Sequence, residues 1–228
     1  GSGKGTQAAR LRHDFGLTHL STGDILRRHR AQRTDLGRQA TSSMTLGRLV
    51  PDELVISMLL QELDAAGPGG FLLDGFPRTT AQAYALDRPL GKAGRRLTAA
   101  LFLDAPDAVI VERLSGRLTC PRGHVFNART QPPARPGVCD HDGEPLSVRD
   151  DDRAETVRRR LDVYHEVTEP LVGYYEERGV LHSFNGLSTP DAVSEAIRGS
   201  LGLAPATRFS RTPSEAVLVH TPGARGRS

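Results

Sequence analysis

Gly1-Ser2-Gly3-Lys4-Gly5-Thr6 begins the sequence, and an apolar pattern at Ala8, Leu11 and Phe15 follows before Gly16. The spacing of these apolar residues predicts an amphipathic helix that ends at the glycine. A glycine-rich turn at the start of a helix points backbone N–H groups at an anion, and a lysine there reaches the phosphates of a nucleotide. The stretch therefore predicts a phosphate-binding loop that leads into a helix. The alternative is a flexible glycine-rich end with one chance lysine.

A complete loop of this kind has another glycine upstream and follows an apolar strand. The sequence given starts at Gly1 and has no initiator methionine. We therefore expect about ten upstream residues, enough for a strand and the remaining loop glycine, to be absent from it.

Short apolar runs alternate with helical patterns along most of the chain. The runs occupy residues 18–21, 71–73, 99–103 and 180–184. Between them, Pro51-Asp52-Glu53, Pro106-Asp107 and Thr189-Pro190-Asp191 are typical of helix starts. The alternation predicts an α/β fold, with a parallel sheet as its core and helices on both faces of the sheet.

Composition excludes several classes of protein. The chain has 228 residues, of which 37% are hydrophobic and 25% are charged, with 24 glycines. This suits one sizeable core with small inserted units, and it excludes collagen, coiled coils and wholesale disorder. No run approaches the roughly 18 apolar residues of a membrane helix, and the first residues do not form a basic, apolar signal sequence. We therefore expect a cytoplasmic protein without a membrane partner.

The charge of the chain is modest but unevenly composed. The net charge is +3, and 28 arginines stand beside only two lysines. So small an excess is weak evidence for nucleic-acid binding. The chain has no tryptophan and few aromatic residues on which bases could stack. We therefore expect no nucleic-acid partner.

Two pairs of arginines are candidates for holding an anion. Arg113 and Arg117 are four residues apart in a predicted helix, so their like charges repel unless an anion lies between them. The alternative is a solvated helix face with Glu112 as the counter-charge. Arg149 and Arg160 flank the aspartates at 150–152, which could simply be an N-cap with first-turn acids.

Polar residues also follow two predicted strands directly. Ser21-Thr22-Gly23-Asp24 precedes Arg27, and Asp74-Gly75-Phe76-Pro77 precedes Arg78. Open α/β sheets bind ligands at the carboxyl ends of their strands. These residues are therefore candidates for a ligand site beside the glycine-rich loop.

Four segments together resemble bacterial adenylate kinase. They are Ser21–Arg27, Leu49–Val55, Phe71–Thr79 and the stretch from Asp151-Asp152 to Tyr174-Tyr175. They occur in the order of that family with near-family spacing, and the resemblance covers residues 1 to about 201. The Asp-Gly-Phe-Pro-Arg segment is very specific, whereas the phosphate loop is shared by many nucleoside triphosphatases. The missing first strand and first loop glycine depart from the family pattern.

The resemblance implies a division of the chain into units. The core domain would comprise residues 1–20, 51–117 and 153–201, and residues 21–50 would form the AMP-binding unit. Residues 118–152, which hold five prolines and both cysteines, would form the lid of the long-lid form of the family. We expect residues 202–228 to be a disordered tail, with only a short apolar patch at 216–219.

The resemblance also implies roles for individual residues. ATP would be held by Gly1, Ser2, Gly3, Lys4, Gly5, Thr6, Arg113, Phe126 and Gly186. AMP would be held by Thr22, Arg27, Arg48, the backbone of Val50, Gly75, Arg78, Gln82, Arg149 and Arg160. Catalysis would rest on Lys4, Arg78, Arg113, Arg117, Arg149 and Arg160. Mg²⁺ would enter with ATP, near Thr6 and through water at Asp74. Gln82 is the expected reader of the AMP base, because an amide can pair with an adenine edge.

The lid contains a candidate metal site. Cys120 and His124 form C-x3-H, and Cys139 and Asp142 form C-x2-D. Zinc takes four such ligands in a tetrahedron, and two ligand pairs on tight turns would hold together a unit that has little core. We therefore expect zinc to be possible at these four residues.

This pattern is not the usual one of the family, whose lids carry C-x2-C followed by C-x2-C or C-x2-D. Gly123 stands where a second cysteine would be, so His124, or as a weaker candidate His141, must substitute. The alternative is a lid held by hydrogen bonds with two inert thiols.

The leading hypothesis is reversible phosphoryl transfer between ATP and AMP by a monomeric enzyme, with ADP as product. A different nucleoside monophosphate kinase is the nearest alternative. An inactive nucleotide-binding remnant is another, because a missing central strand would expose the edges of its two neighbours.

Overall fold

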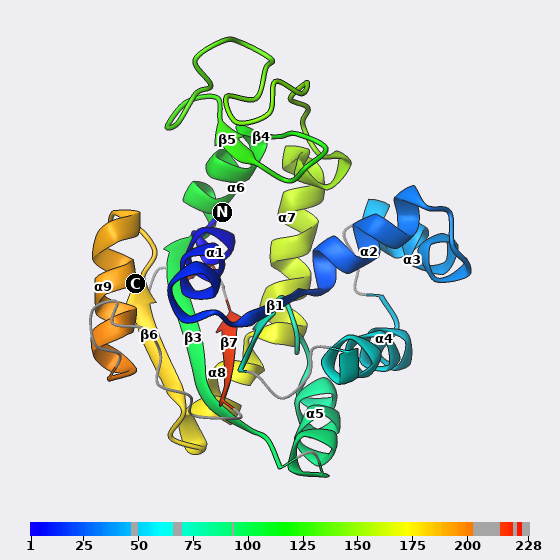
Figure 1. The fold of residues 1–228 in the computed structure, drawn as a ribbon, viewed down its shortest axis with the longest axis vertical. Coiled ribbons are helices and arrows are strands. Elements are labelled where there is room, and N and C mark those ends of the chain that lie inside the picture. Colours follow the sequence, from blue (N-terminus) through cyan, green and yellow to red (C-terminus); the bar gives the residue numbers. More distant parts are fainter. Residues whose placement is uncertain (47–49, 66–69, 93, 203–214, 221–222, 225–228) are drawn as a thin grey trace.

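A computed structural model describes residues 1–46, 50–65, 70–92, 94–202, 215–220 and 223–224 (Figure 1). Its centre is a parallel sheet in the order β1-β2-β7-β3-β6. The strands are β1 (Thr18–Ser21), β2 (Phe71–Asp74), β3 (Arg96–Pro106), β6 (Leu181–Asn185) and β7 (Glu215–His220). The short β8 (Gly223–Ala224) pairs with the end of β3. The four strands expected from the apolar runs are therefore confirmed.

Helices connect and cover the strands. They are α1 (Lys4–Phe15), α2 (Thr22–Ala31), α3 (Asp35–Thr45), α4 (Asp52–Ala65), α5 (Thr80–Lys92), α6 (Asp107–Ser115), α7 (Ala154–Val163), α8 (Pro170–Glu177) and α9 (Pro190–Ser200). A 3₁₀ turn at Asp150–Asp152 precedes α7, and a π-helical turn at Tyr164–Thr168 joins α7 to α8. The three expected helix starts are confirmed at α4, α6 and α9.

Successive strand residues pack into different layers of the core. Phe71 and Leu73 belong to a cluster that includes Leu59 of α4, together with residues of α5 and α8. Leu72 belongs to a second cluster with Leu11 of α1 and with residues of α9. A strand that is buried on both faces reads as a continuous apolar run, and each fully buried Leu or Phe side chain contributes about 1.5–3 kcal/mol. The predicted α/β fold with helices on both faces of the sheet is confirmed.

Two smaller units extend from this core (Figure 1). One consists of α2 and α3. The other contains the antiparallel pair β4 (Arg117–Thr119) and β5 (Val125–Asn127). Its small core comprises Cys120, Phe126 and Cys139, with Leu118 and Leu146 packed against them. We call residues 118–152 the lid.

Residues 202–228 were expected to be a disordered tail, but part of this segment forms the strand β7. Glu215–His220 lies between β2 and β3 and pairs with both in parallel register. Residues 203–214, 221–222 and 225–228 of the same expected tail lie outside the described part of the chain. The apolar patch at 216–219 is therefore part of the sheet, with β2 on one side and β3 on the other.

Helix length sets a limit on membrane crossing. Among the described residues, no helix is both long enough and apolar enough to traverse a bilayer.

Candidate active site

The glycine-rich loop meets α1 at Gly3, whose φ of 98° lies in the left-handed region that favours glycine. No side chain caps this end of α1, and its first turn contains no acidic residue. Within the described part of the chain, the N–H groups of the first turn and the positive end of the helix dipole are thus not capped by an acidic side chain of the same turn. Ser2 is buried, and its Oγ has no hydrogen-bond partner among the residues that the structure describes. These features suit an anion placed at the start of α1.

Lys4 of this helix pairs with Asp74 at the carboxyl end of β2. His19 of β1 contacts the other carboxylate oxygen, with its Nε2 3.2 Å from Asp74 Oδ2. Burial alone would raise the pKa of the Asp74 carboxyl, but Lys4 and His19 outweigh it and hold this pKa well below its ordinary value. Asp74 is therefore ionised beside Lys4 at neutral pH.

Polar groups at the ends of β1 and β2 contact each other. Thr22 Oγ1 donates a hydrogen bond to the Gly75 carbonyl at 3.1 Å, and Arg78 Nε donates to the same carbonyl at 2.8 Å. Gly75 has a φ of 79°, and a Cβ there would lie 3.2 Å from both the Thr22 hydroxyl and the Arg78 guanidinium. The left-handed backbone conformation, together with this close approach, favours glycine at this position.

Gln82 lies at the start of α5 and is buried. Its Oε1 accepts a hydrogen bond from the Arg78 N–H at 2.6 Å, and its Nε2 donates to Asp52 Oδ1 at 2.6 Å. Thr79 supports the same network by donating to Asp52 Oδ2 at 3.2 Å. Both ends of the Gln82 amide are thus engaged by protein groups.

Arginines from distant segments converge near Lys4. Arg117 makes a bidentate pair with the fully buried Asp152, through contacts of 2.7 and 2.6 Å. Arg160 donates to the Asp151 carbonyl at 3.0 Å. Arg27, on α2, lies 3.8 Å from the Asp151 carboxylate. Because aspartates separate these like charges, several guanidinium groups can share one region of the molecule.

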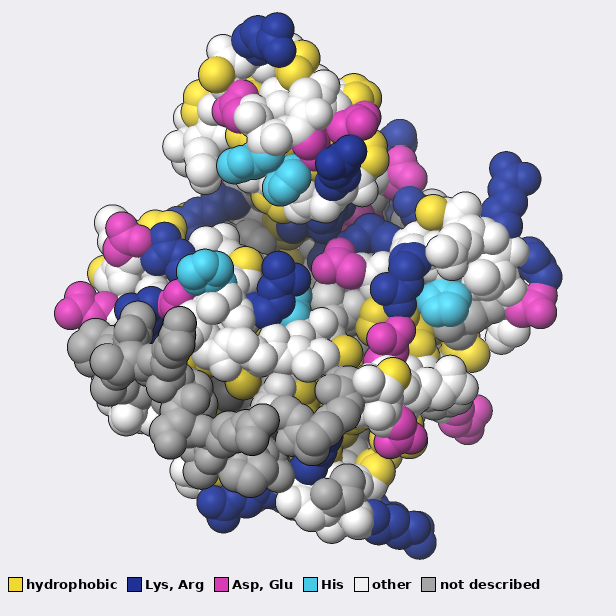
Figure 2. Space-filling model, viewed as in Figure 1, with side chains coloured by type: hydrophobic (Ala, Val, Ile, Leu, Met, Phe, Trp, Pro, Cys, Tyr) yellow, Lys and Arg dark blue, Asp and Glu magenta, His cyan; other side chains and the backbone are white. Residues whose placement is uncertain are grey.

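Burial and the close spacing of the arginines lower the pKa values of two of them. Burial, reinforced by Arg160 and Arg27, lowers the pKa of Arg78 to about 10. Burial, reinforced by Arg117 and Arg27, lowers the pKa of Arg149 to about 10. Both groups still carry a full charge at neutral pH. Figure 2 shows Lys and Arg side chains gathered in the hollow between the lid and the rest of the molecule. The hollow is therefore strongly cationic and suited to several phosphates.

Arg113 lies next to the loop in a different arrangement. Its Nη1 donates to the Gly186 carbonyl at 2.8 Å and to the Gly1 carbonyl at 3.2 Å. Gly186 is confined, because a Cβ there would lie 2.7 Å from the Asp104 carbonyl oxygen and 3.0 Å from the Ser2 carbonyl oxygen. The structure thus brings together three residues expected at the ATP site.

The remaining expected residues are less central. Phe126 is buried inside the lid, in the cluster with Cys120 and Cys139. Thr6 is exposed in the first turn of α1, as is Gly5. Val50 belongs to the main core. Arg48 lies outside the described residues.

The four expected metal ligands come together in the lid. The ligand atoms of Cys120, His124, Cys139 and Asp142 lie within 4.8 Å of one another. His124 Nδ1 is 2.9 Å from Asp142 Oδ2, 3.3 Å from Cys120 Sγ and 3.5 Å from Cys139 Sγ. Ligands at zinc distances of about 2.0–2.3 Å stand about 3.3–3.8 Å apart in a tetrahedron, so the cluster is consistent with a zinc site. His141 lies beside His124, with ring centroids 4.7 Å apart and the rings tilted by 42°, and it is not one of the four.

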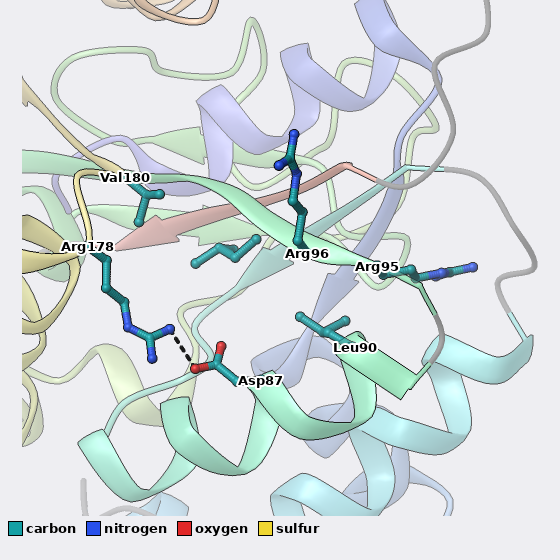
Figure 3. A pocket seen from close by; sticks show the side chains of 8 residues that line it. Asp87, Leu90, Arg95, Arg96, Arg178 and Val180 are labelled. Carbon is teal, nitrogen blue, oxygen red and sulfur yellow. Dashed lines mark hydrogen bonds and ion pairs between the residues drawn. The ribbon is translucent and has the colours of Figure 1, made fainter.

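A separate pocket of about 370 Å³ lies at the opposite end of the strands (Figure 3). It lies beside α5, the start of β3 and Val180, just before β6. Two of the lining residues, Arg178 and Asp87, form an ion pair with a distance of 2.6 Å between Arg178 Nη1 and Asp87 Oδ2. The pocket is distinct from the cationic hollow because its lining residues lie at the amino ends of β3 and β6, whereas open α/β sheets bind their ligands at the carboxyl ends of the strands.

Several site residues were not found by reasoning from the sequence. His19 was only part of a predicted strand and Asp52 only part of a predicted helix start, and each reaches the site because two elements pack together. The aspartates at 150–152 were interpreted from the sequence as a cap as well as neighbours of arginines, but two of them are the counter-charges of the cluster. Three consecutive aspartates between two arginines were the available signal.

A phosphate loop, an ionised carboxylate beside its lysine and a set of converging arginines define a nucleotide-binding protein of the P-loop class. The family model for adenylate kinase matches residues 1–180. The adenylate kinase of Streptomyces coelicolor is 46% identical over 198 residues, covering 85% of this chain and 91% of that protein. That of Caldicellulosiruptor bescii is 48% identical over 205 residues, covering 89% and 95%. The chain therefore belongs to the adenylate kinase family.

Proposed function

We propose that this adenylate kinase catalyses the reversible reaction ATP + AMP = 2 ADP through the residues converging on the cationic hollow. The observation that carries the proposal is the meeting of arginines from several segments beside the Lys4–Asp74 pair. Two phosphate-bearing substrates held side by side need such a density of fixed positive charge, and one phosphate site does not.

The donor nucleotide would bind at the start of α1. Lys4 and the N–H groups of the first turn would hold the ATP phosphates, and Arg113 would lie against the nucleotide near Gly186. Mg²⁺ would be held by ATP, by Thr6 and through water by Asp74, which fits because the Asp74 carboxyl is buried and ionised. When bound, Mg²⁺ neutralises charge on the phosphates.

The acceptor would bind at the ends of β1 and β2. Thr22, Arg27 and Arg78 would hold the AMP phosphate, with Gly75 allowing its close approach. Val50 would contribute its backbone and Arg48 its charge. Gln82 would read the adenine edge, with Asp52 fixing the orientation of its amide.

Catalysis requires no general base. The nucleophile is a phosphate oxygen of AMP, which is already ionised at neutral pH, so the protein must align the substrates and stabilise charge on the moving phosphoryl group. Arg78, Arg117, Arg149 and Arg160 would do so with planar guanidinium groups that remain charged. Closure of the lid would exclude water, which otherwise competes as acceptor, and its reopening would limit turnover.

The units are proposed as expected from the sequence. Residues 21–50 would be the AMP-binding unit, and residues 118–152 would be a lid stapled by zinc at Cys120, His124, Cys139 and Asp142. We further propose that the enzyme is a monomer of the cytoplasm.

The test is ADP formation with ATP and each of AMP, CMP, UMP and GMP as acceptor, measured on the same preparation. AMP should be preferred, and Gln82→Leu should reduce this preference while leaving binding of ATP alone near wild type. A comparable rate with another nucleoside monophosphate would assign a different acceptor. The absence of ADP formation with every acceptor would favour a nucleotide-binding remnant.

A further inference from the structure

The side-chain amide of Gln82 is held at both ends by groups whose hydrogen-bonding character is fixed. The main-chain N–H of Arg78, which only donates, bonds to Gln82 Oε1 at 2.6 Å. The carboxylate of Asp52, which only accepts, bonds to Gln82 Nε2 at 2.6 Å. Gln82 is buried, so water competes little for either bond. The oxygen of the amide is therefore held toward Arg78, and its nitrogen is held toward Asp52.

Thr79 holds the Asp52 carboxylate in turn. Its hydroxyl donates to Asp52 Oδ2 at 3.2 Å and accepts from the Gln82 N–H at 3.0 Å. Asp52 lies in the first turn of α4, which contacts the helix α5 that carries Gln82. The spacing of Thr79 and Gln82 is that of a capping box, which uses only the side-chain oxygen of the glutamine. The bond from Gln82 Nε2 to Asp52 is therefore not part of the capping of α5.

An amide held in this way presents a defined pattern to a ligand. Oε1 has a second lone pair, and Nε2 has a second N–H. The positions that remain thus accept on the oxygen and donate on the nitrogen. Adenine offers the complementary order, because its 6-amino group donates and its ring nitrogens accept. A 6-oxopurine such as guanine or hypoxanthine has an oxygen in place of the 6-amino group, and this oxygen would face Gln82 Oε1.

Pairing with a 6-oxopurine would require the Gln82 amide to flip. The flip would set Nε2 against the Arg78 N–H, donor against donor, and Oε1 against the Asp52 carboxylate, acceptor against acceptor. Each mismatch would leave a polar group without a partner in a buried place, which is unfavourable. Of the two groups, only Asp52 acts through a side chain, so it is the one that a substitution can change.

We propose that Asp52 is the positioning residue that sets the base specificity of the acceptor site. It locks the Gln82 amide in the orientation that pairs with a 6-aminopurine and rejects a 6-oxopurine. This inference rests on the proposed binding of AMP beside Gln82, and it names the feature of the base that the site selects.

Replacing Asp52 by asparagine tests the lock. The asparagine amide either accepts from Nε2 or donates to Oε1, so it permits both orientations of Gln82. The ratio of the dissociation constants of IMP and AMP, measured by calorimetry, should fall by about tenfold, as expected when a charged acceptor no longer opposes the flip. Glu53→Gln is the matched control, because it removes an exposed acid from the same first turn of α4 and should keep the wild-type ratio.

Two further comparisons separate the lock from a general loosening of the site. CMP carries an amino group beside a ring nitrogen, as AMP does, so its binding relative to AMP should stay the same in Asp52→Asn. In a Gln82→Leu background, Asp52→Asn should leave the ratio for IMP and AMP unchanged, because Asp52 acts through Gln82. An equal gain for CMP and IMP, or the same effect of Asp52→Asn with and without Gln82, would overturn the proposal.

Binding and ADP formation, measured on the same preparations, distinguish the two ways of failing. A wild type that binds IMP as tightly as AMP, or a ratio unchanged in Asp52→Asn, would overturn the lock even if ADP forms from AMP. A preference for AMP that falls in Asp52→Asn, in a protein that forms no ADP with any acceptor, would refute the proposed reaction and support the lock. Thermal unfolding shows whether Asp52→Asn folds; should it not, Asp52→Ser also removes the carboxylate and should change the ratio in the same direction.

Discussion

Replacing Asp152 by alanine tests the electrostatic design of the cationic hollow. Asp152 is fully buried and accepts both hydrogen bonds of the Arg117 fork, at 2.7 and 2.6 Å, and it lies 3.8 Å from Arg160. Removing one partner of a buried pair leaves the other charge uncompensated and costs about 3–5 kcal/mol. Here the cost is aggravated because Arg117 also lowers the pKa of Arg149 by its proximity.

The loss should be visible as a fall in thermal stability. For a domain of this size, 1 kcal/mol corresponds to about 2–4 °C in Tm, so Asp152→Ala should lower Tm by about 6–20 °C. Calorimetry or circular dichroism measures it. Mg-ADP should raise the Tm of the variant by more than that of the wild type, because its phosphates restore negative charge between the arginines.

Asp150→Ala is the matched control. Asp150 belongs to the same 3₁₀ turn, but its side chain is 66% exposed and its partner, Arg30, lies 3.3 Å away. A surface pair of this kind contributes no more than about 1 kcal/mol. If the two variants unfold within about 2 °C of each other, the guanidinium groups do not depend on buried aspartate, and the reasoning is refuted.

Three further predictions concern acid, alkali and metal. Asp74→Asn should destabilise the protein at pH 7, and this difference should shrink progressively as the pH falls below about 4, because a carboxyl whose pKa is lowered on folding contributes its full stability above the unfolded pKa and loses it as the pH falls toward the folded pKa. Urea unfolding at pH 7 and pH 3 measures the difference, and a pH-independent difference would speak against the Lys4 pair. His165 lies between two carboxylates that raise its pKa against the opposing effect of burial, so His165→Gln should cost more stability at pH 6 than at pH 9, as unfolding at the two pH values will show. One zinc per chain should be found by metal analysis of the wild type and lost in Cys139→Ser, while His141→Ala should retain it; retention of metal by both variants would exclude these ligands.

The sequence by itself determined those features that depend on neighbours along the chain. The helix that follows the glycine-rich loop and the strand expected at 71–73 follow from glycine placement and from a short apolar run, and they correspond to α1 and β2. The spacing of Cys120, His124, Cys139 and Asp142 was also sufficient to predict their cluster, because short turns bring such pairs together. Each of these features arises from local backbone geometry or from burial of nearby side chains. Both leave a pattern in the periodicity and spacing of residues, so the sequence is sufficient to predict them.

Only the tertiary structure decided which distant groups meet. His19 reaches Asp74 because β1 and β2 pair in a particular register, and Asp52 orients Gln82 because the starts of α4 and α5 meet. The sequence predicted that the apolar patch at 216–219 is part of a disordered tail, because four residues do not indicate with which strands they pair. Its place between β2 and β3 depends on edges formed by residues more than a hundred positions away, and no local pattern encodes that pairing.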